Sequence, residues 1–253
     1  MDIKIKSSSE IEKMTEAGRI LAEILDELFT YVRPGISTYE LDTICEKLIK
    51  KNECLPILKG YEGFPSASCI SVNDQVGHGI PHPEHFLDEG DIVKIDTSIS
   101  YNGWCADAAR TIPVGKADPL LLDLIENVKG AFYAGLEKAV AGNQLNEIGR
   151  AIEEFAVRHD LSVVRDMMGH GIGQKLHEDP PVPHFKEDED GPLLLSGMTL
   201  AIEPMLNMGE SDVVWGDDDW TVYTADYSFS AHYENTILIT DNKPVILTPV
   251  SYC

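Results

Sequence analysis

Five side chains could bind divalent metal ions: Asp96, Asp107, His170, Glu203 and Glu234. Asp96 and Glu203 lie in apolar runs, and an apolar run follows Glu234. A strand carboxylate in such surroundings either faces solvent by alternation or is buried with a partner. Several buried carboxylates repel one another, and two divalent cations would remove that conflict. Oxygen donors with a single imidazole suit Mn(II), Fe(II), Co(II) or Zn(II). The sequence therefore indicates a two-metal centre.

A predicted hairpin brings the first two carboxylates together. Strand-like runs at 92–99 and 104–114 flank Asn102-Gly103, and an Asn-Gly pair is the strongest short-range signal for a hairpin turn. With these two residues as the loop, Asp96 lies opposite Ala109, and Asp107 is diagonal to Asp96 on the same face. Side chains about 7–8 Å apart at the backbone can share two ions that lie about 3.5–4 Å apart.

An internal repeat relates Asp96 to Glu203. Three features recur in the same order: Gly35-x4-Glu40-Leu41-x4-Glu46 as Gly142-x4-Glu147-Ile148-x4-Glu153, Gly90-x-x-Val93-x-Ile95-Asp96 as Gly197-x-x-Leu200-x-Ile202-Glu203, and Gly77-His78-Gly79-Ile80 as Gly169-His170-Gly171-Ile172. One such match arises by chance in many chains, whereas three in order favour duplication. The repeat then places Asp96 and Glu203 at equivalent points of two sheet edges. His170, which as a lone histidine in a glycine-rich loop could be a surface residue, is the candidate nitrogen ligand.

The elements that would position these residues predict an α+β fold. Helical patterns cover 9–32 and 38–52, the second opened by Ser37 or Thr38. We expect one domain over 1–253, made of halves at about 10–115 and 120–250 that are related by a pseudo-two-fold axis, with a joined antiparallel sheet and the helices outside. The acidic runs at 187–190 and 217–219 are typical of solvated loops.

Composition restricts the partners and the compartment. The 253 residues are 43% hydrophobic and carry a formal charge of -23, which argues against nucleic-acid binding and against anionic membranes. An acidic balance suits cations or a free peptide amine, and it also serves solubility. No signal-peptide core and no apolar run of about 18 residues is present, so we expect a cytoplasmic protein. Five scattered cysteines without a C-x-x-C pair indicate reduced thiols.

The metal centre would support hydrolysis of a carbonyl compound. A catalytic metal can lower the pKa of its bound water from 15.7 to about 7, which supplies hydroxide near neutral pH. Glu203 is the candidate proton shuttle, and His78 and His177 are candidate hydrogen-bond donors, although a surface or packing role is the alternative for both histidines. The sequence holds no G-x-S-x-G, P-loop, H-E-x-x-H or dinucleotide motif that would indicate another chemistry.

Five sequence blocks together resemble the type I methionine aminopeptidases of the pita-bread fold: SVNDQVGHGIP, DIVKIDTSISYNGWCADAARTIPVG, GHGIGQKLHEDP, GMTLAIEPM and DWTVYTADYSFSAHYENTILIT. The resemblance implies two divalent ions, Co, Mn, Fe(II) or Zn, in which Asp96 chelates one ion, His170 completes the other, and Asp107 and Glu234 bridge. The last ligand that it implies is Glu203. It also implies that a hydroxide bridging the metals attacks the first peptide bond and removes the initiator methionine from nascent proteins when the second residue is small.

The resemblance extends to the substrate. It implies that His78 and His177 contact the peptide and that Tyr61, Phe64, Cys69 and Trp220 line the pocket for the methionine side chain. Aromatic rings and a thiol are suitable partners for a thioether. Departures from the family pattern affect the pocket and the surroundings of the metals: Leu58, Gly77, Leu176, His232 and Asn235.

The expected partners are the N-termini of nascent peptides and the ribosome exit region, with the enzyme acting as a monomer that requires no nucleic acid and no membrane. An X-Pro aminopeptidase or prolidase would use the same metals, but these relatives usually carry an additional N-terminal domain, for which the residues before Asp96 leave no room. A binding protein that kept the fold and lost its metals is the remaining alternative, and such proteins usually lack ligands that are present here.

Overall fold

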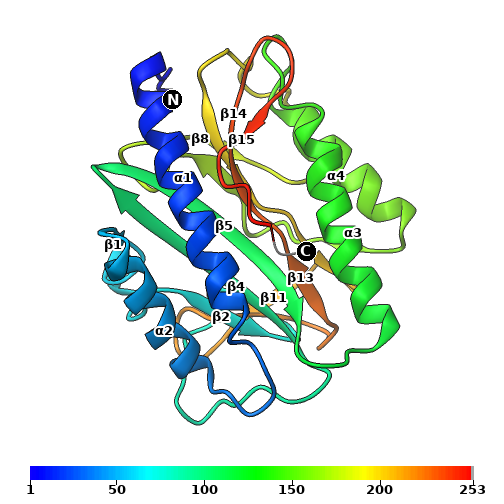
Figure 1. The fold of residues 1–253 in the computed structure, drawn as a ribbon. Coiled ribbons are helices and arrows are strands. Elements are labelled where there is room, and N and C mark those ends of the chain that lie inside the picture. Colours follow the sequence, from blue (N-terminus) through cyan, green and yellow to red (C-terminus); the bar gives the residue numbers. More distant parts are fainter. Residues whose placement is uncertain (252–253) are drawn as a thin grey trace.

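The computed structural model describes residues 1–251 and shows helices packed against antiparallel strands (Figure 1). The first part of the chain contains α1 (Ser8–Phe29), α2 (Thr38–Lys51), β1 (Leu55–Pro56), the 3-10 turn η1 (Tyr61–Gly63), β2 (Cys69–Val72), β3 (Gln75–Gly77), β4 (Ile92–Tyr101) and β5 (Trp104–Pro113). The second part contains α3 (Pro119–Leu136), α4 (Asn146–Arg158), β6 (Ser162–Val163), β7 (Gly169–Gly171), β8 (Glu178–Val182), β9 (Thr199–Ile202), β10 (Met205–Asn207), β11 (Val213–Trp215), β12 (Val222–Thr224), β13 (Ser230–His232), β14 (Asn235–Leu238) and β15 (Val245–Ile246). The predicted α+β class is confirmed.

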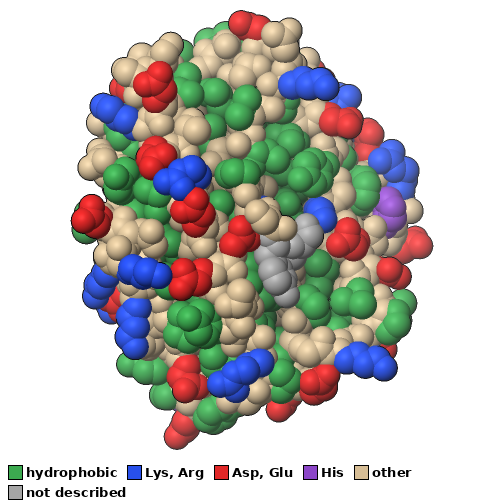
Figure 2. Space-filling model, viewed as in Figure 1, with side chains coloured by type: hydrophobic (Ala, Val, Ile, Leu, Met, Phe, Trp, Pro, Cys, Tyr) green, Lys and Arg blue, Asp and Glu red, His purple; other side chains and the backbone are tan. Residues whose placement is uncertain are grey.

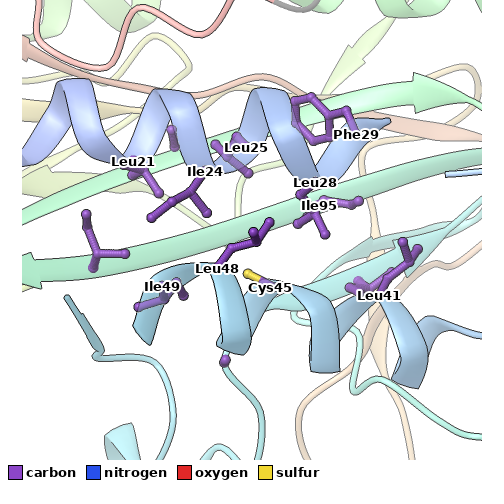
Figure 3. Close-up of a cluster of buried hydrophobic side chains, with 14 of the residues drawn as sticks. Leu21, Ile24, Leu25, Leu28, Phe29, Leu41, Cys45, Leu48, Ile49 and Ile95 are labelled. Carbon is purple, nitrogen blue, oxygen red and sulfur yellow. The ribbon is translucent and has the colours of Figure 1, made fainter. Parts of the chain in front are cut away.

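Helices α1 and α2 form an apolar layer over the β4–β5 hairpin (Figures 1 and 3). Their inward faces carry aliphatic residues at helical spacing, which fill a buried core that includes Ile95 of β4. Ser37 begins α2: its hydroxyl accepts a hydrogen bond from the backbone N–H of Glu40, whose carboxylate accepts one from the N–H of Ser37. Helix α1 ends at Phe29, earlier than predicted, because residues 30–32 form a turn ahead of Pro34.

The β4–β5 hairpin has the predicted register. Tyr101 pairs with Trp104 across the Asn102-Gly103 turn, and Asp96 pairs with Ala109. Both turn residues have positive φ, 50° and 79°, as this tight turn requires. One face of the hairpin packs against the helices, so the opposite face carries Asp96 and Asp107 together.

The strands form four antiparallel sheets where the sequence predicted one joined sheet: β1-β4-β2 with β5 on β4, β13-β10-β6, β11-β12-β3, and β15-β14-β9-β7-β8. A seam joins the first sheet to the last. The Thr236 hydroxyl of β14 accepts a hydrogen bond from the N–H of Asp107 and donates one to its carbonyl, and the N–H of Glu234 donates to the carbonyl of Ala109. Strands β5 and β14 therefore lie side by side without a continuous ladder, because a threonine hydroxyl replaces the backbone pairing at this point.

The order of two helices followed by paired strands occurs twice along the chain. Glycines at matched positions share a left-handed backbone: φ is 82° at Gly35 and 96° at Gly142, and 98° at Gly90 and 92° at Gly197. Residues with a side chain rarely adopt this conformation. The shared conformation supports the duplication predicted from sequence.

The surface carries many charged side chains (Figure 2), and the described cysteines are not paired with one another. On the face shown in Figure 2, acidic and basic side chains are interspersed. Among the described residues, no helix is long and apolar enough to cross a membrane. Cys45, Cys54, Cys69 and Cys105 are buried free thiols, as predicted. Cys253 lies outside the described residues.

Candidate metal centre and substrate pocket

The five predicted ligands line one cavity of about 270 Å³. Asp96 and Asp107 come from the hairpin β4–β5, and His170 comes from β7. Glu203 directly follows β9, and Glu234 directly precedes β14. Segments that are far apart in sequence thus bring all five side chains to the seam between the first and the last sheet.

The ligand atoms lie close enough to share metal ions. One donor atom each from Asp107, His170 and Glu234 lies within 4.8 Å of the others. Nε2 of His170 is 3.6 Å from Oδ2 of Asp107 and 3.6 Å from Oε1 of Glu203. Asp96 lies beside them on the same cavity wall. The separations exceed direct hydrogen-bond distances, as expected for donors that face a common centre.

Neighbouring groups orient two of these side chains and hold the backbone of a third ligand. Nδ1 of His170 lies 2.9 Å from the carbonyl oxygen of Gly171, to which it donates, so Nε2 carries the lone pair that faces the carboxylates. Ser98 donates its hydroxyl to Oδ1 of Asp107 at 2.7 Å. Nε2 of His184 accepts the backbone N–H of Glu203 at 3.1 Å. Hydrogen bonds therefore fix the histidine tautomer and the position of the Asp107 carboxylate before any ion binds.

The electrostatics of the cavity favour the binding of cations. Burial, with Asp107 and the neighbouring acids adding to it, raises the pKa of Asp96, Glu203 and Glu234 well above ordinary carboxylate values. Oε1 of Glu234 is buried without a hydrogen-bond partner. An unpaired buried carboxylate oxygen among other acids is costly unless a cation neutralises it. The residues present therefore fit divalent metal ions with mixed oxygen and nitrogen ligands.

Two further histidines face the centre. His177 makes an edge contact with the ring of His170, with ring centroids 4.3 Å apart, and its Nδ1 lies 2.6 Å from the Tyr61 hydroxyl. Loss of hydration, together with His170, lowers the pKa of His177 to about 4. His78 follows β3 in the left-handed region, at φ 53°, and its Nδ1 is buried without a partner. A strained backbone and an unpaired polar atom both indicate a functional position.

The predicted pocket residues lie together at one end of the cavity. Phe64 and Trp220 are in edge contact at 5.2 Å, and Trp220 lies 6.4 Å from His78 between ring centroids. Cys69 pairs with Asp96 across β2 and β4 and is 3% exposed. Tyr61 completes the predicted set on the same cavity wall. Every site residue predicted from the sequence thus lines one cavity.

The departures from the family pattern have visible consequences. Leu58 and Leu176 both line the cavity, so these two departures change the wall of the pocket. A side chain at Gly77 would bring its Cβ to 3.1 Å from Cε of Met167, so the glycine leaves space for that methionine. Asn235 accepts a hydrogen bond from the buried Arg110 guanidinium at 2.9 Å, and Nε2 of the buried His232 has no partner.

Sequence reasoning missed two groups of site residues. Ser98 and His184 orient ligands, and their roles depend on contacts that no local pattern reveals. The remaining missed residues also line the cavity: Glu62, Asp166, Met167, Met168 and Trp215. They lie in loops and on a short strand, where the sequence shows no periodicity.

Comparison with known proteins assigns the family. The model of metallopeptidase family M24 matches residues 12–241. The chain belongs to metallopeptidase family M24. A methionine aminopeptidase of Clostridium perfringens is 50% identical over 246 residues, which cover 97% of this chain and 98% of the relative. The crystal structure of methionine aminopeptidase from Rickettsia prowazekii superposes with a TM-score of 0.95 at 38% identity, covering 97% of this chain and 99% of that one.

The M24 pita-bread fold predicted by resemblance is thereby confirmed. Among the more distant structures, a prolidase from Pyrococcus furiosus has a TM-score of 0.76 at 24% identity, and this chain covers 66% of its length. At that identity the likeness shows the shared fold alone. The aminopeptidases, in contrast, match this M24 metallopeptidase over nearly the whole of both chains.

Proposed function

We propose that this M24 metallopeptidase is a type I methionine aminopeptidase, which removes the N-terminal methionine of nascent proteins when the second residue is small. One observation carries the proposal: the five metal-binding side chains and two histidines surround a single cavity whose aromatic end contains the buried Phe64 and Cys69. A flexible, polarizable methionine side chain suits such an end. A cavity of about 270 Å³ that must also hold the methionine side chain favours a small second side chain.

The metal ions would be held by Asp96, Asp107, His170, Glu203 and Glu234. We propose two divalent ions per chain, drawn from Co, Mn, Fe(II) and Zn, since the ligand set admits each of them. When bound, they supply Lewis-acid activation of the peptide carbonyl and of water near neutral pH.

The protein side chains would move the proton and stabilise the developing charge. Glu203 accepts a proton from the attacking water and returns it to the leaving amine. Its position among the metal ligands suits this exchange, because a carboxylate beside the attacking water can reach both the water and the leaving amine. His78 and His177 donate hydrogen bonds to the peptide and to the tetrahedral oxygen.

Tyr61 would fix the proton of His177. The low pKa of His177 keeps its ring neutral at neutral pH, so only one ring nitrogen carries hydrogen. A hydrogen bond from the Tyr61 hydroxyl to Nδ1 places that hydrogen on Nε2. His177 is then ready to donate to the substrate without first rearranging.

We further propose that the enzyme is one domain, built from duplicated halves at about 10–115 and 120–250, and that it acts as a monomer. The acidic surface and the free thiols support a cytoplasmic location, and the substrate class implies work near the ribosome exit region. No membrane or nucleic acid is required.

The test compares three peptides with protein reconstituted with metal. We expect methionine release from Met-Ala-Ser, no cleavage of Ala-Pro-Ala, and slow cleavage of Met-Lys-Ser. Cleavage of Ala-Pro-Ala would instead indicate a proline-directed M24 enzyme. Efficient cleavage of Met-Lys-Ser would contradict the small-residue rule. Undiminished Met-Ala-Ser hydrolysis by Glu203→Ala would remove Glu203 from the mechanism.

A further inference from the structure

The cavity has a buried end and an exposed end. Its aromatic end contains Phe64 and Cys69, each 3% exposed. Two large apolar residues on its lining are instead exposed to solvent, Met168 at 44% and Trp215 at 56%. When the first side chain of a peptide occupies the buried end, the rest of the peptide must extend past the exposed residues. This argument rests on the proposed function.

Packing holds Met168 and Trp215 on the same side of the cavity. Met167 lies in a small buried cluster against which Val213, the first residue of β11, is packed. The chain segment that carries Met168 is thereby anchored beside the strand that ends at Trp215. Trp215 pairs with Val222 of β12, which pairs with Gly77 of β3, so one ladder runs from Trp215 to the residue before His78.

That ladder indicates how far Trp215 lies from the reacting peptide bond. Neighbouring strands lie about 4.8 Å apart, so the Trp215 backbone is about 10 Å from the Gly77 backbone. An extended peptide advances about 3.3–3.6 Å per residue, which places its third Cα about 7 Å beyond the first. The third side chain of a substrate bound at His78 therefore comes within reach of the Trp215 ring.

We propose that Met168 and Trp215 form an apolar contact surface for the third residue of the substrate, giving the enzyme a preference for peptides with a large apolar or aromatic side chain there. The thioether and the indole ring both interact well with aromatic groups. Glu62 and Asp166 line the same exposed end and carry negative charge, so an acidic third residue is disfavoured by repulsion.

The experiment measures kcat/KM for Met-Ala-Trp, Met-Ala-Ser and Met-Ala-Asp with reconstituted enzyme. The wild type is expected to prefer Met-Ala-Trp over Met-Ala-Ser by about tenfold, mainly through KM, and to cleave Met-Ala-Asp most slowly. In Trp215→Ser the ratio of the first two values falls to near one. Trp215→Phe, which keeps an aromatic ring, restores most of it.

Val214→Ser is the matched control. Val214 precedes Trp215 on the same strand, is 50% exposed and does not line the cavity, since successive strand residues point to opposite faces. It should keep the wild-type ratio. A wild-type ratio near one, or an equal loss in Val214→Ser and Trp215→Ser, overturns the proposal. Failure of the proposed function is distinguishable, because the wild type would then release methionine from none of the three peptides.

Discussion

The two faces of strand β4 differ in what they contribute. Val93, Ile95 and Ile99 point into the helix-covered core, where each is fully buried. Complete burial of such a side chain stabilises the fold by about 1.5–3 kcal/mol. The alternate residues Lys94 and Asp96 point toward the seam with the second half of the chain, where burial opposes their charges.

On the second face, burial disfavours the charged forms of the side chains. Burial lowers the pKa of Lys94 to about 7, although its ammonium donates to the carbonyl oxygens of Asn73 and Ser230. Burial also raises the pKa of Asp96. One face of β4 therefore stabilises the protein. The other face buries charged groups, and bound metal ions would offset the unfavourable burial of its carboxylate. Four experiments test this difference between the two faces and the site that one of them carries.

The largest effect is expected from Asp96→Asn. The variant keeps the shape of the side chain but loses a negatively charged ligand, so kcat/KM for Met-Ala-Ser should fall by roughly a thousandfold or more. In chelator at pH 7.5 the variant should melt at the same temperature as the wild type or higher, because it removes one of several repelling carboxylates. A metal-free variant that melts several degrees lower would contradict the comparison.

The complementary change on the other face is Ile95→Ala. It leaves a cavity in the core and should lower the free energy of unfolding by about 2–5 kcal/mol, measured by urea denaturation. The kcat/KM of the folded fraction should stay within about threefold of the wild type. A loss of activity as large as that of Asp96→Asn would show that the two faces are not separable.

Metal removal should have an effect that depends on pH. The folded-state pKa values of Asp96, Glu203 and Glu234 are raised, so their contribution to stability is fully present below the unfolded values near 4 and is lost as pH rises through the folded values. Metal binds the deprotonated forms and restores the stability that was lost. The gain in Tm on adding metal should therefore be larger at pH 8 than at pH 5. An equal gain at both pH values would argue against the raised pKa values.

The smallest effect is expected from Tyr61→Phe. The ring stays in place and only the hydrogen bond to Nδ1 of His177 is lost, which is worth about 0.5–1.5 kcal/mol. This corresponds to a decrease of about three- to tenfold in kcat/KM for Met-Ala-Ser. The decrease should lie in kcat more than in KM if Tyr61 fixes the histidine proton for the transition state. Unchanged kinetics would leave Tyr61 with a packing role only.

Local signals in the sequence predicted much of this architecture. The Asn102-Gly103 turn determined the register that pairs Asp96 with Ala109, and Ser37 with Glu40 marked the start of α2. These features depend on residues close in sequence, where conformational preference acts directly.

Long-range pairing could not be predicted in the same way. The sequence suggested one joined sheet, but a threonine hydroxyl interrupts the ladder between β5 and β14, and a single side chain of this kind has no local signature. The pairing of Gly77 with Val222, which brings β11 to the cavity, joins segments far apart in the chain. Trp215 was therefore not singled out from the sequence. Ser98 and His184 were missed for the same reason, since their partners are determined only by the completed fold.

The Thr236 seam has a consequence for the order of events during synthesis. Its hydroxyl holds the backbone of Asp107, and Glu203 and Glu234 reach the centre from strands made much later than the hairpin. A chain emerging from the ribosome therefore lacks the fifth donor, Glu234, until β14 has been made and has docked. Metal uptake thus reports that folding has finished, and hydrolytic activity is withheld from every incomplete form of the enzyme.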